Sequence, residues 1–197
     1  MLPNRCVLYL FMRWIIFLSL HFLVFFILIL PYAQAEEEWS IKAYDGYSYA
    51  AVSGEIQHGD KLIFILDPSD NCERVTNTFS FYTWEDPRDL KQLIDKDIPL
   101  KLNGKVGLTA RVIAVNPILN GNHIIFSLGA FPIKDYIGFL DEFYKKIKKY
   151  EIEIVDGEDF KAKKYFDITV NNWKLNYLVP SIQKANRLCN QMKPLES

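Results

Sequence analysis

The N-terminal apolar run constrains this chain most, because it sets the compartment and leaves a defined length of chain to fold. The run extends from Trp14 to Leu30, follows two arginines and precedes Ala33-Gln-Ala35. A charged start, an apolar stretch and an Ala-x-Ala site are typical of a cleaved secretory signal peptide. We therefore expect residues 1–35 to be a signal peptide and residues 36–197 to be an exported protein, periplasmic or secreted.

The same run has a second interpretation. Its 17 residues lie at the short edge of the length that spans a bilayer, so an uncleaved segment would be an inner-membrane anchor. Pro31 and the acidic Glu36-Glu37-Glu38 stand where a cleavage site requires them and favour cleavage. Only the uncleaved form would contact a membrane. Translation from Met12 would give a more compact charged region than translation from Met1.

The remaining 162 residues suffice for a single α+β domain with one core and are short for two domains. Two of the 23 basic residues and none of the 24 acidic ones fall in residues 1–35, so the exported part carries a net charge of about −3. Phosphate binding needs a basic excess, so this composition argues against nucleic acid as a partner. It also argues against an electrostatic membrane-binding surface.

Two cysteines remain after Cys6 leaves with the signal peptide, and these are Cys72 and Cys189. An even pair in an exported protein predicts a disulfide. A metal site or a reactive thiol are the alternatives. The absence of a Cys-x-x-Cys pair and of a nearby histidine disfavours both.

Short β-branched and aromatic segments separated by turn residues predict a strand-rich region. Asp45-Gly46 and Asn103-Gly104 are hairpin dipeptides, which pair 39–44 with 47–52 and 100–102 with 105–115. Residues 116–122 are expected to form a turn. Further strands are predicted over 61–66, 76–84, 123–128, 151–155 and 164–170.

Two later segments have helical rather than strand periodicity. Apolar residues recur at three and four positions from Ile133 to Ile147 and again from Leu178 to Met192, which predicts helices near 133–149 and 179–192. Strands first and helices late favour an α+β fold. We expect a mainly antiparallel sheet of seven to nine strands, a sandwich or half-barrel, covered on one side by the two helices.

No pattern of catalytic residues is recognisable in the exported part. Its only histidines are His58 and His123, and no Gly-x-Ser-x-Gly is present. Carboxylates cluster at 67–70, 85–89 and 156–159 without the spacing of a calcium loop. We therefore assign no catalytic residue, metal ligand or cofactor. A carboxylate pair that only the fold brings together keeps an envelope hydrolase, acting on glycan or peptide, as an alternative.

Aromatic residues are in excess and fall mostly in the strand region. Alternation along 76–84 directs Tyr82 and Trp84 away from the phenylalanines of the same strand. These two side chains are our candidate binding residues, with Tyr47 and Tyr49 of the first hairpin beside them. The other interpretation is that the aromatic residues fill the core and cover its edges.

The C-terminal part has a late strand Phe166-x-Ile168-x-Val170, then Trp173, and a last helix that ends in Ala185-x-x-x-Cys189. Together with the signal peptide and the β-rich body, this layout resembles small disulfide-stapled periplasmic proteins of Gram-negative bacteria, of the invasion-associated locus B type. That type usually has a glycine after the late strand, where this chain has Asn171-Asn172. The resemblance implies a non-enzymatic role in the envelope or in host interaction.

These observations predict an exported, non-enzymatic binding module of the bacterial envelope. An exported compact fold without a recognisable reactive group more often recognises a partner than transforms it. Its expected partner is an envelope or host protein, a peptide or a glycan.

Overall fold

The structure is a computed structural model that describes residues 39–57, 59–147 and 149–192. The predicted signal peptide therefore lies outside the described residues. Within the described part, no helix is both long and apolar enough to cross a bilayer.

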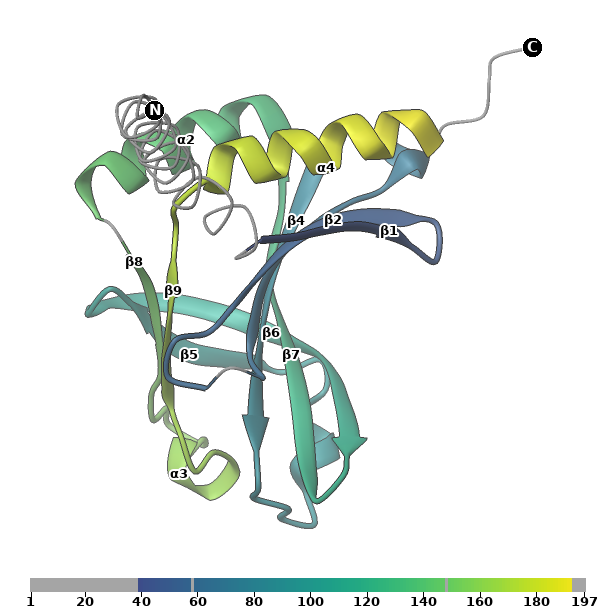
Figure 1. The fold of residues 1–197 in the computed structure, drawn as a ribbon. Helices are drawn as coiled ribbons and strands as arrows, with labels where there is room; N and C mark the ends of the chain where they lie inside the picture. Colours follow the sequence, from purple (N-terminus) through teal and green to yellow (C-terminus); the bar gives the residue numbers. More distant parts are fainter. Residues whose placement is uncertain (1–38, 58, 148, 193–197) are drawn as a thin grey trace, which may run out of the picture. The chain divides into compact units, whose positions relative to one another are not determined.

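Nine strands form one sheet in the order β1-β2-β3-β4-β7-β6-β5-β8-β9, and every pair of neighbours is antiparallel (Figure 1). This confirms the predicted mainly antiparallel sheet. The strands are β1 (Trp39–Tyr44), β2 (Tyr47–Ser53), β3 (Lys61–Leu66), β4 (Arg74–Thr83), β5 (Asp97–Leu102), β6 (Lys105–Ile118), β7 (Gly121–Pro132), β8 (Lys149–Ile154) and β9 (Val170–Lys174).

The two long helices lie late in the chain, α2 after β7 and α4 after β9, and together with the sheet they make an α+β fold. The described α-helices are α2 (Ile133–Lys146), α3 (Ala162–Tyr165) and α4 (Leu178–Met192), with short 3₁₀ turns η1 (Pro68–Asp70) and η2 (Leu90–Leu93). Helix α4 packs on β1, β2 and β3, whereas α2 contacts β4, β7 and α4. In Figure 1 both long helices run across the same end of the sheet.

The sheet is strongly curved, and irregularities in its ladders account for the bending. Register shifts lie at Asn77/Thr78, Leu100/Lys101 and Val112/Ala114, and such bulges bend a strand and increase its twist. The curvature brings the last strand back to the loop after β2, where the Glu55 backbone N–H donates to the Asn172 carbonyl at 2.8 Å.

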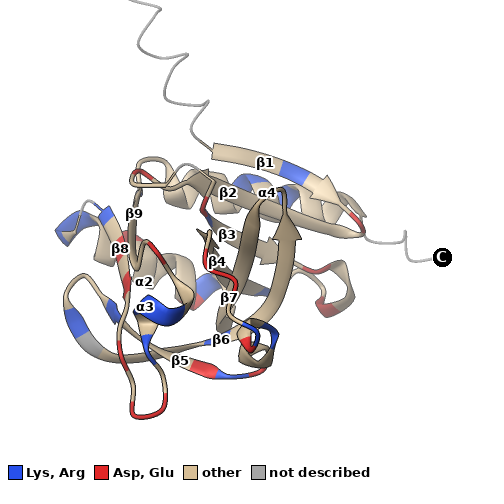
Figure 2. Cartoon of the chain, turned by 90° about the horizontal axis from the view of Figure 1, so that it is seen from below, with Lys and Arg blue, Asp and Glu red and all other residues tan. Residues whose placement is uncertain are grey.

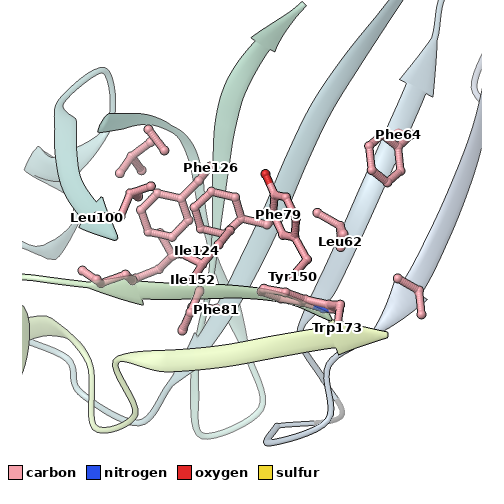
Figure 3. Close-up of a cluster of buried hydrophobic side chains, with 14 of the residues drawn as sticks. Leu62, Phe64, Phe79, Phe81, Leu100, Ile124, Phe126, Tyr150, Ile152 and Trp173 are labelled. Carbon is pink, nitrogen blue, oxygen red and sulfur yellow. The ribbon is translucent and has the colours of Figure 1, made fainter. Parts of the chain in front are cut away.

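The concave side of the sheet is filled by aromatic and branched side chains (Figure 3). Phe79 and Phe126 stack at 4.8 Å, and Phe81, Phe166 and Trp173 meet them edge-on or tilted. All five are fully buried, and each contributes about 1.5–3 kcal/mol through its removal from water. These five aromatic side chains therefore belong to the core.

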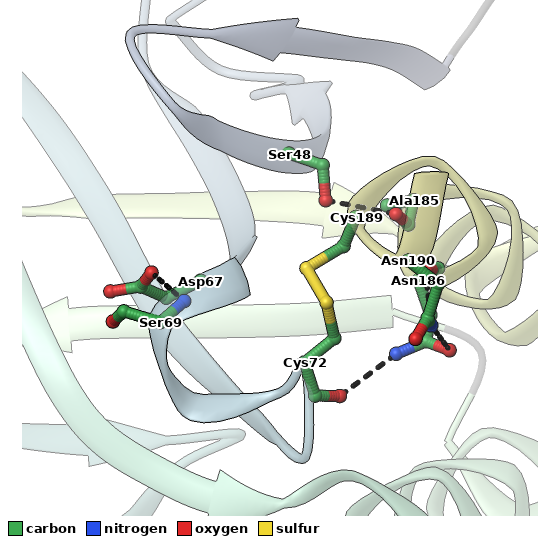
Figure 4. Close-up of a disulfide and its surroundings, with 8 residues drawn as sticks. All are labelled: Ser48, Asp67, Ser69, Cys72, Ala185, Asn186, Cys189 and Asn190. Carbon is green, nitrogen blue, oxygen red and sulfur yellow. Dashed lines mark hydrogen bonds between the residues drawn. A yellow bond between two sulfur atoms is a disulfide. The ribbon is translucent and has the colours of Figure 1, made fainter. Parts of the chain in front are cut away.

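The predicted disulfide is confirmed. Cys72 and Cys189 are bonded with their Cα atoms 6.1 Å apart, and both side chains are buried (Figure 4). Two hydrogen bonds reinforce the link, since Asn186 Nδ2 donates to the Cys72 carbonyl at 2.9 Å and Ser48 Oγ to the Ala185 carbonyl at 2.8 Å. The disulfide thus ties the C-terminal half of α4 to the segment between β3 and β4.

Three segments differ from the sequence-based prediction. The helix predicted near 133–149 ends at Lys146, and Lys149 begins β8. The strand predicted over 164–170 begins only at Val170, as β9, and Lys164 and Tyr165 belong to α3. The β8–β9 ladder ends where the Ile154 backbone N–H donates to the Thr169 carbonyl, so 164–168 have no strand to pair with. The predicted turn over 116–122 is also shorter, since β6 and β7 continue through it and leave a loop of Leu119 and Asn120 alone.

Candidate functional site

Tyr82 and Trp84 lie at the end of β4 on the convex, outer face of the sheet. Trp84 is 58% exposed and Tyr82 is half-buried. Their rings are nearly perpendicular, with centroids 5.0 Å apart, as expected for side chains two residues apart on one face of a strand.

Two carboxylates fix the backbone that carries this aromatic pair. Asp60 Oδ1 accepts a hydrogen bond from the Tyr82 backbone N–H at 2.6 Å. Asp167 Oδ1 accepts from Thr83 Oγ1 at 2.9 Å and from the Trp84 backbone N–H at 3.2 Å. Hydrogen bonds from two separate segments of the chain therefore fix the backbone from Tyr82 to Trp84, and with it the position of the Trp84 side chain.

Asp60 belongs to a buried polar network that also joins β9 to the loop after β2. Its Oδ2 accepts from Asn171 Nδ2 at 2.7 Å, and Asn171 Oδ1 accepts from the Ile56 backbone N–H at 3.0 Å. Gly54 leaves the room for this network, since a Cβ there would lie 2.3 Å from Asn171 Nδ2. Burial raises the pKa of Asp60 to about 7, against the lowering effect of its two hydrogen bonds.

The hairpin between β6 and β7 ends beside the aromatic pair. Thr83 pairs with Asn122 and Ile118 pairs with Gly121, so continuing the register by one residue places Trp84 and Ile118 on either side of Gly121. A Cβ on Gly121 would lie 2.5 Å from Tyr82 Oη, so the Tyr82 ring occupies the space that the glycine leaves open.

We refer to Tyr82, Trp84, Ile118 and Leu119 as the apolar tip. Ile118 is 40% exposed and Leu119 is 98% exposed. Sequence reasoning missed these two aliphatic residues because it predicts a turn over 116–122 and selects no binding residue there. A bulky leucine between turn residues was the signal that would have pointed to them.

Tyr47 and Tyr49 lie elsewhere on the outer face. They line a groove of about 530 Å³ over β1, β2 and β3, together with Lys42 and Ile63. Tyr49 pairs with Ile65, which pairs with Thr76, and Thr76 precedes Tyr82 by roughly 20 Å along β4. The structure therefore brings Tyr82 and Trp84 together but separates them from Tyr47 and Tyr49.

Two of the acidic stretches seen in the sequence meet at a second cavity. The lining of this cavity of about 590 Å³ includes Asp89, Asp97, Glu158 and Asp159. Asp89 accepts hydrogen bonds from Lys164 Nζ and Tyr165 Oη, which lower its pKa. Figure 2 shows acidic and basic segments interleaved around α3 and β5.

Two carboxylates of this acidic cavity, Asp89 and Asp97, form ion pairs with basic side chains. Arg111 donates to both carboxylate oxygens of Asp97, at 3.0 and 3.1 Å, and lowers the pKa of Asp97. Asp89 and Asp97 are therefore both ionised at neutral pH. A general acid needs a raised pKa, so these two carboxylates do not provide the proton donor that a glycosidase mechanism requires.

Of two further candidate groups, Asp67 has a structural hydrogen bond, whereas the buried His123 Nε2 has no hydrogen-bond partner. Asp67 Oδ1 accepts from the Ser69 backbone N–H at 2.7 Å and caps η1. His123 pairs with Tyr82 across the ladder, and burial lowers the pKa of its imidazole. Across the described residues, no three His, Cys, Asp or Glu side chains lie close enough to hold a metal ion.

The fold and the site together define a disulfide-bonded, β-rich protein with an exposed apolar tip. Comparison with known proteins adds no further assignment, because no family model, curated protein or solved structure matches the chain.

Proposed function

We propose that this chain is an exported, non-enzymatic binding module of the bacterial envelope that recognises a partner through the apolar tip. The observation that carries the proposal is the Trp84 side chain, 58% exposed on a backbone held by Asp60 and Asp167. Exposed aromatic residues on a rigid support are the usual anchors of interfaces, because little side-chain entropy is lost on binding.

Two further features support export. The apolar run from Trp14 to Leu30 followed by Ala33-Gln-Ala35 is typical of a signal peptide. The bond between Cys72 and Cys189 suits an oxidising compartment such as the periplasm. The alternative of a signal-anchored inner-membrane protein with a periplasmic domain would place the same binding module at the membrane.

The curved sheet is best described as a half-barrel. A sandwich has two sheets that face each other, whereas here one continuous ladder runs from β1 to β9. The bond from Glu55 to Asn172 then links the loop after β2 to β9.

The hydrolase alternative would place its chemistry in the acidic cavity, where Asp89 and Asp97 are both ion-paired. We favour the binding module because the pKa values of both carboxylates are lowered and neither acts as a general acid at neutral pH.

Site-specific photocrosslinking in the native envelope tests the proposed function. A photoreactive aromatic residue replaces Trp84 in one variant and Tyr44 in the control, because Tyr44 is an exposed aromatic residue at the β1–β2 turn. We expect a discrete crosslinked species from position 84 only, with a lower yield when Tyr82→Ala is added. Equal products from both positions, or none from position 84, would refute the assignment of the site.

A further inference from the structure

Leu119 is unusual both in its exposure and in its backbone. Its side chain is 98% exposed, and its φ of +49° lies in the left-handed region that L-residues with bulky side chains rarely adopt. In a two-residue hairpin loop a positive φ is normally supplied by Gly, Asn or Asp. The chain therefore keeps a leucine where folding alone would favour a smaller residue.

Packing of the core explains why the β6–β7 loop lies at residues 119–120. It does not explain why the first residue of that loop is a leucine. Asn120-Gly121 would be the favoured hairpin dipeptide, yet the loop consists of Leu119 and Asn120. A shift by one residue would turn the buried Ile124 and Phe126 outward, so the core fixes the register. A glycine at 119 would satisfy the same register without the strain.

Two carboxylates lie beside the apolar tip, on the segment that follows Trp84. Glu85 and Asp86 directly follow Trp84 and are exposed, and Asn122 Nδ2 holds them near β7 by bonding to the Glu85 carbonyl at 3.3 Å and to Asp86 Oδ1 at 3.4 Å. Arg88 is the next cation along the chain. Carboxylates at this edge disfavour contact with an anionic lipid surface.

We infer that the apolar tip docks into an apolar pocket of a partner protein whose rim carries Lys or Arg side chains, with Leu119 and Trp84 entering the pocket and Glu85 and Asp86 meeting the rim. This inference rests on the proposed function and specifies the partner. Charge complementarity at the rim sets orientation and association rate, while the desolvated tip supplies affinity. Two adjacent aliphatic side chains, which offer no hydrogen bonds, favour a protein over a glycan.

Selection from a random-peptide display library tests the inference on the oxidised protein purified after expression of the full chain. We expect enriched peptides that combine apolar residues with Lys or Arg. A synthetic selected peptide should bind Leu119→Gly about tenfold or more weakly than the wild type, as for truncated interface anchors. Glu85→Gln/Asp86→Asn should bind several-fold more weakly, with a smaller dependence on salt.

Tyr177→Gly is the matched control. Like Leu119, Tyr177 is a large exposed side chain on a backbone with positive φ, at +61°, but it lies directly before α4 and outside the apolar tip. It should bind the peptide as the wild type does. The inference is overturned if the enriched peptides are acidic, if none depends on Leu119, or if vesicles of phosphatidylglycerol and phosphatidylethanolamine bind in a manner that depends on Leu119. If Trp84→Ala loses binding of the peptide while Leu119→Gly and Glu85→Gln/Asp86→Asn bind as the wild type does, the proposed function stands and the inferred type of partner is rejected.

Discussion

At the scale of one residue, the positive φ of Leu119 affects the stability of the fold. We predict that Leu119→Gly raises the free energy of unfolding by about 1 kcal/mol, because glycine adopts φ of +49° without strain. Urea unfolding followed by tryptophan fluorescence measures the change. Leu119→Ala is the control, since alanine removes the side chain but retains the strain and should not stabilise the protein.

Asp60 should make stability depend on pH. Its pKa is about 7 in the folded protein and near 3.8 in the unfolded chain, so the folded state binds the proton more tightly. The stabilisation from this group is fully present below about pH 4 and is lost as pH rises through 7, with a slope of up to about 1.4 kcal/mol per pH unit.

Asp60→Asn should abolish this slope in urea unfolding measured between pH 4 and pH 8. Overall stability should also fall, because the new amide cannot accept from both the Tyr82 backbone N–H and Asn171 Nδ2. The exposed Asp159→Asn serves as control and should keep the wild-type slope. An unchanged slope in Asp60→Asn would contradict the prediction.

At the scale of elements, α4 depends on its disulfide. Cys72→Ser/Cys189→Ser opens a link across 117 residues and should lower the free energy of unfolding by about 2–5 kcal/mol. Hydrogen exchange should show the loss of protection first in the C-terminal half of α4, whereas α2 changes less. Asn186→Ala, which removes only the hydrogen bond to the Cys72 carbonyl, should cost about 1 kcal/mol. Equal stability of the double variant and the wild type would refute this role.

The strands also show which local signals are sufficient. Asp45-Gly46 and Asn103-Gly104 form the predicted hairpins, with positive φ at all four residues as that turn requires. Residues 164–169 have an equally regular alternation and still do not form a strand, because Lys164 and Tyr165 belong to α3 and no neighbouring strand is available before Val170. Alternation of apolar and polar residues shows which face of a segment can be buried. Forming a strand also requires a neighbouring strand for backbone hydrogen bonds, and only the fold supplies that neighbour.

At the scale of the whole molecule, Asn171 joins β9 to the loop between β2 and β3. Asn171→Ala removes its bonds to the Ile56 backbone N–H, the Gln57 carbonyl and Asp60, and should cost about 3 kcal/mol because buried groups lose their partners. Hydrogen exchange should show β9 and the 54–57 loop opening together. Asn172→Ala is the matched control, since Asn172 Oδ1 is buried without a hydrogen bond, and it should cost much less. Similar losses in both variants would contradict the assigned role.

The sequence by itself determined the strand-rich body, both hairpin turns, the two long helices and the cysteine pair, because hydrophobic period, turn chemistry and cysteine number are local properties. It also indicated that Tyr82 and Trp84 face away from the core. Only the tertiary structure decided that Ile118 and Leu119 join these aromatic residues, that Tyr47 and Tyr49 do not, and that Asp60 and Asn171 meet in the interior. These contacts depend on strand order and register, which bring together residues up to 111 positions apart and leave no trace in the local pattern.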